Sequence, residues 1–224
     1  MATSGTVAFR PNVEEIITES FERCGIDIQT RTGDHAISAR RSINLLFSEF
    51  ANRGINYWTL SQNTLPLVNG TTSYTLPVGT IDILDAVIRD SSSGTDQIIN
   101  RITIQDYNQL PNKDSEGKPS QYMIDRQYTP VVYFWAVPNT STYSMVYWAM
   151  NQLEDVTLSN QDADIPYRWN DTICAGLASK LAMKYAPEKF QVLNEMYERS
   201  FNFAASSDND GVSLRVQPTA LNMT

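Results

Sequence analysis

The chain has 224 residues, of which 42% are hydrophobic and 19% are charged, and its formal net charge is −8. This composition predicts a folded core and excludes a disordered polymer. The negative charge argues against a protein that binds nucleic acid by neutralising phosphates, although DNA could pass an acidic wall without sticking to it. The sequence contains no apolar run of the roughly 18 residues that a membrane-spanning helix needs. Residues 1–10 also lack the pattern of a signal peptide, so we expect synthesis in a cytoplasm and no contact with a membrane.

Two helices are predicted near the N-terminus. The first begins after Asn12, a good N-cap that forms a capping-box pattern with Glu15, and it ends at Gly25. A second helix is predicted after Asp34 and is followed by Gly54, because apolar residues recur there at helical spacing. The outer face of the first helix is predicted to be solvated; it carries Glu14, Glu15, Glu19 and Glu22.

The region 58–153 has a different pattern, in which β-branched and aromatic residues alternate with polar ones between frequent turn residues. Asn69-Gly70 lies between two strand-like runs and predicts a hairpin. Helical segments that would connect parallel strands are missing, so an antiparallel sandwich or small barrel is expected. The predicted strands are Thr59–Val68, Ser73–Leu76, Ile81–Arg89, Gln97–Ile104, Gln121–Arg126, Val131–Val137 and Tyr143–Gln152.

Helical spacing returns after this region. A third helix is predicted from Asp164, as a possible N-cap, with Pro166 in its first turn, and a fourth opens at Pro187. Each pair of helices is short, so we expect the two pairs to pack together. The predicted fold class is therefore α+β: a four-helix bundle interrupted by an inserted antiparallel β-domain and followed by an extended C-terminal arm. The expected boundaries are 12–57 and 164–206 for the bundle, 58–153 for the β-domain and 207–224 for the arm.

The arm begins with an acidic linker and continues with Val212, Leu214 and Val216, which alternate with polar residues. Ordering a residue costs roughly 1–2 kcal/mol of backbone entropy, and a few buried apolar side chains return about 1.5–3 kcal/mol each. The arm is therefore expected to be either a disordered tail or a segment that becomes ordered on a partner.

The sequence offers little for catalysis or metal binding, so an enzyme is not expected and no catalytic residue, cofactor or metal is predicted. The one histidine, His35, is expected at the surface, and no phosphate-binding or nucleophile motif is present. Carboxylate pairs such as Asp82 and Asp85 are expected on any acidic surface. Cys24 and Cys174 lie on apolar helix faces without a C-x-x-C neighbour, which indicates buried free thiols.

Aromatic residues cluster in the last predicted strands. Alternation places Tyr133 and Trp135 on one face of a strand and Phe134 on the other, and Tyr147-Trp148 follows in the next strand. Such residues commonly fill a sandwich core. The alternative is a carbohydrate- or receptor-binding β-module on a helical stem.

Several segments together resemble the head-to-tail adaptor of short-tailed bacteriophages, the group that includes tail tubular protein A and the packaged-DNA stabilisation proteins. The matching segments are Ala39-Arg-Arg-Ser-Ile-Asn44, Leu46-Phe47-Ser-Glu-Phe50 with Gly54 and Tyr57-Trp58, Leu65-Pro-Leu67, Ser73-Tyr-Thr-Leu-Pro77, Ile81-Asp-Ile-Leu-Asp-Ala-Val-Ile88, and Ile165-Pro-Tyr-Arg-Trp169 leading into the helix from Ala175 to Ala186. The pattern departs from the family where Ile55-Asn56 separates Gly54 from the aromatic pair, and the arm does not align.

The resemblance implies a component of the virion neck, assembled in the host bacterial cytoplasm. Copies of the chain would form a ring, a dodecamer, beneath the portal protein, and would let DNA pass without sequence-specific binding. The β-domains would face the next protein of the tail, a nozzle or tail tube. For docking of the arm on the portal we expect Val212, Leu214, Arg215, Val216 and Leu221. For packing between subunits we expect Arg40, Arg41, Phe47, Trp58 and Trp169.

Overall fold

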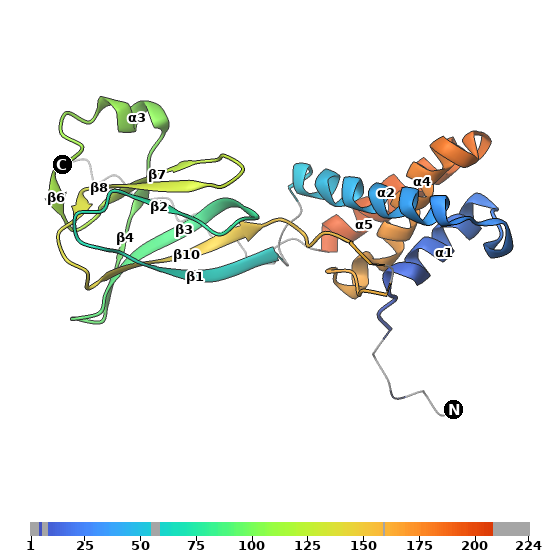
Figure 1. The fold of residues 1–224 in the computed structure, drawn as a ribbon, viewed down its shortest axis with the longest axis horizontal. Coiled ribbons are helices and arrows are strands. Elements are labelled where there is room, and N and C mark those ends of the chain that lie inside the picture. Colours follow the sequence, from blue (N-terminus) through green and yellow to red (C-terminus); the bar gives the residue numbers. More distant parts are fainter. Residues whose placement is uncertain (1–4, 6–8, 55–58, 159, 208–224) are drawn as a thin grey trace, which may run out of the picture.

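The computed structural model describes residue 5 and residues 9–54, 59–158 and 160–207. Figure 1 shows an elongated molecule with the long helices gathered at one end and the strands, together with the short helix α3 (Ile104–Gln109), at the other. The chain begins in the helices, crosses into the strands and returns to the helices. The fold is α+β, as predicted.

Among the residues described, the helical part includes four long helices and short 3-10 turns. The long helices are α1 (Val13–Cys24), α2 (Gly33–Asn52), α4 (Asn170–Tyr185) and α5 (Phe190–Ser207). The short turns are η1 (Ile28–Thr30), η3 (Tyr167–Trp169) and η4 (Pro187–Lys189). Helix α1 begins and ends as predicted: the Asn12 side chain accepts a hydrogen bond from the Glu15 amide, and Gly25 takes the left-handed conformation at φ 78°.

The predicted start of the third helix is wrong. Asp164 lies in a bend and does not cap α4, which begins six residues later at Asn170. Pro166 keeps an extended conformation with ψ 150°, and η3 begins only after it. The residue before a proline is also disfavoured in the helical region, so the chain cannot enter a helix at Ile165.

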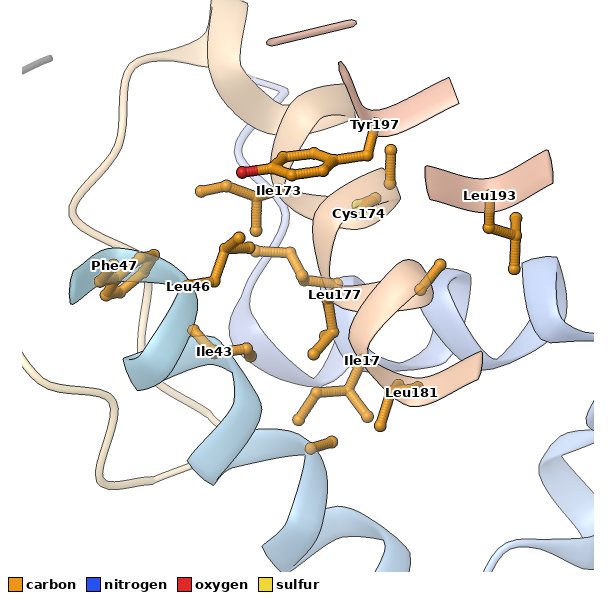
Figure 2. Packing of buried hydrophobic residues seen from close by; sticks show 14 of the residues in the cluster. Ile17, Ile43, Leu46, Phe47, Ile173, Cys174, Leu177, Leu181, Leu193 and Tyr197 are labelled. Atoms are coloured by element: carbon orange, nitrogen blue, oxygen red, sulfur yellow. The ribbon is translucent and has the colours of Figure 1, made fainter. Parts of the chain in front are cut away.

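The four long helices contribute to one hydrophobic core around α4, which contacts α1, α2 and α5. Figure 2 shows Ile17, Leu46 and Leu177, from three different helices, within this core. The close approach of α2 and α5 to α4 requires a glycine in α4. A Cβ at Gly176 would lie 2.9 Å from the side chains of both Leu46 and Tyr197.

The segment that returns from the strands is tied along α2. Leu153 and Val156 are buried in the helical core. The Asn44 side chain accepts a hydrogen bond from the Val156 amide at 2.9 Å and donates one to its carbonyl at 3.3 Å. These contacts hold the exit of the strand region against the helical part.

The β part contains two four-stranded sheets that pack through one core, as a sandwich does. The first sheet has the order β1-β10-β3-β4 and the second has the order β2-β8-β7-β5. Pairing is antiparallel except for two short parallel pairs, β5 with β7 and β6 with β9. The strands are β1 (Leu60–Pro66), β2 (Ser73–Thr75), β3 (Thr80–Asp90), β4 (Thr95–Ile98), β5 (Asn100–Arg101), β6 (Glu116–Gly117), β7 (Gln121–Asp125), β8 (Val131–Trp135), β9 (Val137–Pro138) and β10 (Tyr143–Asn151).

The hairpin predicted at Asn69-Gly70 is wrong. Strand β1 pairs with β10, whereas β2 pairs with β8 in the other sheet. Gly70 does adopt a turn conformation at φ 75°, and its amide donates to the Pro138 carbonyl at 2.8 Å. The turn residues were therefore recognised correctly, but the turn carries the chain from one sheet to the other.

The single strand predicted over Gln97–Ile104 is also wrong. β4 ends at Ile98, Ile99 is buried in the sandwich core, and β5 then joins the second sheet. A short helix, α3 (Ile104–Gln109), follows with Thr103 as its N-cap. Thr103 and Asp106 form a capping box, a signal that was present in the sequence.

Candidate interaction surfaces

The described residues contain no group of three or more His, Cys, Asp or Glu side chains that could hold a metal ion. No helix in the same part of the chain is long and apolar enough to cross a membrane. Cys24 and Cys174 are free and buried, as predicted. Burial raises the pKa of both thiols, and that of Cys174 to about 11, so neither is an activated nucleophile.

His35 is half-buried, which corrects the prediction of a surface residue. Its ring lies 4.7 Å from that of Tyr185 and 5.8 Å from that of Phe21. Its Nδ1 accepts a hydrogen bond from the Thr32 amide at 3.1 Å. His35 therefore completes the start of α2 and packs at the edge of the core.

The carboxylates that sequence reasoning considered for acid–base chemistry have structural partners. Asp82 forms ion pairs with Arg101, at 3.0 Å, and with Arg126. Both arginines belong to the second sheet or its edge, so Asp82 ties the two sheets together. The Asp85 side chain accepts a hydrogen bond from the Ala86 amide at 2.9 Å.

Four of the five residues predicted for packing between subunits are described. Phe47 and Trp169, which are 5% and 0% exposed, belong to the helical core. Side chains this deeply buried position the helices that carry them and do not reach another subunit themselves. Arg40 donates a hydrogen bond to the Thr157 carbonyl at 2.7 Å, whereas Arg41 is exposed. Trp58 lies outside the described residues.

The residues predicted for docking on the portal also lie outside the described residues. Helix α5 ends at Ser207, and the described part of the chain ends with it. The positions concerned are Val212, Leu214, Arg215, Val216 and Leu221. Their role stays a prediction.

A surface that sequence reasoning missed lies on α2 and α4, and we call it the cationic face. It combines three cations with three exposed apolar side chains: Arg41, Lys180 and Lys184 with Ile37, Leu45 and Met183. Burial lowers the pKa of Lys184, and the nearby charges of Arg41 and Lys180 lower it further. The spacing of Ile37, Arg41 and Leu45 at every fourth position of α2 could have shown this stripe in the sequence.

A second surface is an open groove of about 800 Å³ along α5. Met196 and Phe203 are exposed along it, and Arg199 lies over the Phe203 ring at 5.7 Å. Arg23 and Asp171 form an ion pair at 2.9 Å on the opposite wall. An apolar floor with a charged rim is typical of a contact site for another chain.

The third surface is the outer face of the first sheet. Trp148 is 44% exposed there, although Phe134 and Tyr147 fill the sandwich core. Val146, two residues before Trp148, pairs with Val87, and Val87 pairs with the exposed Ile98. Side chains two apart lie on one face of a strand, so these residues form an apolar strip across three strands, in which Trp148 and Ile98 are exposed and Val146 is buried.

Three exposed apolar surfaces on one chain are more than single scattered hydrophobic residues, and such patches mark contacts with other molecules. Such surfaces are typical of a chain that contacts other chains. The family described as SU10 adaptor protein matches residues 12–219, and the chain belongs to this family. It is accordingly a bacteriophage head-to-tail adaptor, a structural protein of the virion. A search of curated proteins found no match.

Proposed function

We propose that this adaptor forms a ring in the virion neck, between the portal protein and the downstream tail protein, and continues the channel for DNA. The observation that carries the proposal is the family match over residues 12–219, which covers the helical part, the β part and most of the chain after α5. The exposed apolar surfaces support it, because a ring subunit must contact its neighbours, the portal and the tail at once. The proposed ring is a dodecamer, assembled in the host bacterial cytoplasm.

The parts of the chain have separate roles in this proposal. The helical domain, 12–57 and 164–206, packs around the channel. The β-domain, 58–153, faces the downstream tail protein, a nozzle or tail tube. The arm, 207–224, docks on the portal through its apolar residues and Arg215. The net charge of −8 suits a passage through which DNA moves without binding.

Co-sedimentation with the cognate portal tests the proposal. The full chain is expected to sediment with portal rings in a fixed ratio. Failure to do so in low and physiological salt would overturn the proposed function.

Deletion of residues 208–224 tests the docking role of the arm. The deletion should abolish or strongly weaken sedimentation with the portal. It should leave thermal unfolding unchanged, because the described residues of both hydrophobic cores all precede residue 208. Normal binding of the shortened chain would show that the portal recognises another surface.

A second candidate function is a carbohydrate- or receptor-binding β-module on a helical stem. The exposed Trp148 on the outer sheet face favours it, since an exposed aromatic ring can stack on a sugar. Binding on a glycan array that is lost in Trp148→Ala, but kept in Tyr128→Ala, would support this function. Tyr128 is a suitable control because it is an exposed aromatic residue of the same part. A silent array would exclude glycans as the ligand.

A further inference from the structure

We propose that neighbouring copies of this chain contact each other head to tail, with the cationic face of one copy against the outer face of α1 in the next. The inference rests on the ring of the proposed function and names the two surfaces that would form it. The acidic face is defined by Glu14, Glu15, Glu19 and Glu22, all exposed on α1, together with Ile28 in η1.

The cationic face has the composition of a contact surface that is missing its partner. Ile37, Leu45 and Met183 are all about half exposed or more. The cations beside them lie close together, although Lys180 is already paired with Glu49 at 2.8 Å. Lys184 donates to the Ser38 and Ser42 hydroxyls at 3.0 and 2.7 Å, and its pKa is lowered by burial and then by Arg41 and Lys180. Carboxylates from another chain would relieve this repulsion.

The face of α1 offers the complementary charge. Its four glutamates are exposed; Glu19 pairs with Arg23, which also reaches Asp171 of α4, and Glu14 lies 3.9 Å from Arg31. Ile28, which is exposed just beyond the end of α1, supplies an apolar side chain for the centre of the contact. Opposite charge and matching apolar surface therefore occur on two different faces of the same chain.

The two faces point in different directions around α4. Helix α1 is fixed to one side of α4, where Ser20 and Cys24 donate to the carbonyls of Cys174 and Ala178. Helix α2 is fixed to another side, where Lys180 pairs with Glu49 and Lys184 reaches Ser42. At 3.6 residues per turn these two sets of α4 positions lie about 120° apart.

This arrangement favours a heterologous contact. Pairing of two identical faces would place cation against cation or carboxylate against carboxylate, whereas head-to-tail pairing joins opposite charges. A phosphate backbone is the other ligand that a group of cations could bind. The exposed apolar side chains among these cations favour a protein surface instead.

Cross-linking between two variants that each carry one added surface cysteine tests the inference. Glu22→Cys places a thiol on the acidic face, and Arg41→Cys places one on the cationic face. With a flexible bis-maleimide and the portal present, a mixture of the two should give a cross-linked heterodimer, and neither variant alone should give a homodimer. The wild-type chain is the control, because Cys24 and Cys174 are buried.

Charge reversal provides a second measurement. Arg41→Glu or Glu22→Lys alone should lower the number of copies bound to each portal ring several-fold, and the loss should deepen as salt is lowered. Both changes in one chain should restore binding, because each contact then again joins opposite charges. Ser48→Glu, on the same side of α2 but outside the cationic face, is the matched control and should have little effect.

Three results would overturn the inference. They are a homodimer from either variant alone, no cross-link when the portal ring is fully occupied, and retention of duplex DNA by the wild type that Arg41→Glu abolishes. The first would indicate pairing of identical faces and the last a DNA contact. Normal sedimentation with the portal in any of these cases would leave the proposed function standing.

Discussion

The two parts of the molecule build their cores in different ways. The core of the β part uses residues from one continuous stretch, Leu67 to Ala149. The core of the helical part combines residues 13–50 with residues 153–204, which lie on either side of that stretch in the sequence. The helical core therefore forms only when residues 13–50 and 153–204 come together, whereas the described residues of the sandwich core all come from one segment.

Polar contacts reinforce this difference. Arg53, at the end of α2, pairs with Glu49 of α2 and Glu198 of α5 at 2.8 and 2.7 Å. Lys180 of α4 and Tyr197 of α5 also donate to Glu49. One network thus joins the early and late helices. The early and late helices therefore cannot separate without breaking this network and the helical core.

The largest expected effect is a loss of stability in one core that leaves the other core unchanged. Trp169→Ala removes the buried ring that packs against Phe50 at 5.3 Å and Phe201 at 5.6 Å, and should cost about 3–5 kcal/mol. Phe134→Ala should cost a similar amount in the sandwich core. Thermal unfolding followed by far-ultraviolet circular dichroism should show a lowered helical transition only in the first variant. Equal loss of helix and sheet signal in both variants would show that the two cores unfold as one.

The next effect concerns the tight packing of α2 and α5 against α4. Gly176→Ala places a methyl group 2.9 Å from Leu46 and Tyr197, and overpacking of this kind costs about 1–3 kcal/mol, of which helix propensity returns up to about 1 kcal/mol. Gly33→Ala at the start of α2 meets nothing within 4 Å and should be neutral or slightly stabilising. Denaturant midpoints of the two variants measure the difference. Equal midpoints would mean that α2 and α5 can separate around α4 at no cost.

The network at Glu49 predicts a pH dependence. Burial acts to raise the pKa of Glu49, but hydrogen bonds from Lys180 and Tyr197 and the charges of Lys180 and Arg53 hold it below its ordinary value of 4.5. The unfolded state therefore binds the proton more readily. The stability that this carboxylate supplies is complete above about pH 4.5 and is lost as pH falls through the folded pKa.

Glu49→Gln tests this dependence. The variant should be less stable than the wild type by about 1–2 kcal/mol at neutral pH, because charge-assisted hydrogen bonds are lost. The difference should narrow below pH 4.5 in a series of urea unfolding curves. Glu154→Gln, at an exposed position, is the control and should parallel the wild type. A stability difference between the variant and the wild type that stays constant down to pH 3 would show that Glu49 is not the source of the pH dependence.

The smallest effect is expected on the surface of the β part. Arg89 and Asp96 form a 2.7 Å ion pair across β3 and β4, but both side chains are well exposed. Surface pairs contribute little, because water and salt screen them. Arg89→Ala should leave the sandwich transition unchanged in calorimetry. A clear loss of stability would show that the open edge at β4 depends on this pair.

Local signals were recovered well from the sequence. Asn12, Glu15 and Gly25 predicted both ends of α1, because a cap depends only on residues within one turn. The strands near Ile83, Val132 and Met145 followed from alternation. The capping box at Thr103 and Asp106 was equally local, and α3 was missed only because a strand-like run led into it.

The candidate surfaces could be predicted only in part. The stripe on α2 that combines Ile37 and Leu45 with Arg41 is visible in their spacing, but the crowding of Lys184 requires α4 to lie beside α2. The exposure of Trp148 depends on the side of the sheet that the second sheet covers. The position of α4 beside α2, and that of the second sheet against the first, cannot be read from the residues next to Lys184 or Trp148 in the sequence.

The sequence alone determined the two kinds of periodicity, the order helix–strand–helix and the acidic charge, because these follow from neighbouring residues. Tertiary structure decided which sheet follows Asn69-Gly70, whether Trp169 faces the core or a partner, and which cations crowd together. Those outcomes depend on segments more than 50 residues apart, whose pairing is set by the burial of whole faces rather than by any local signal.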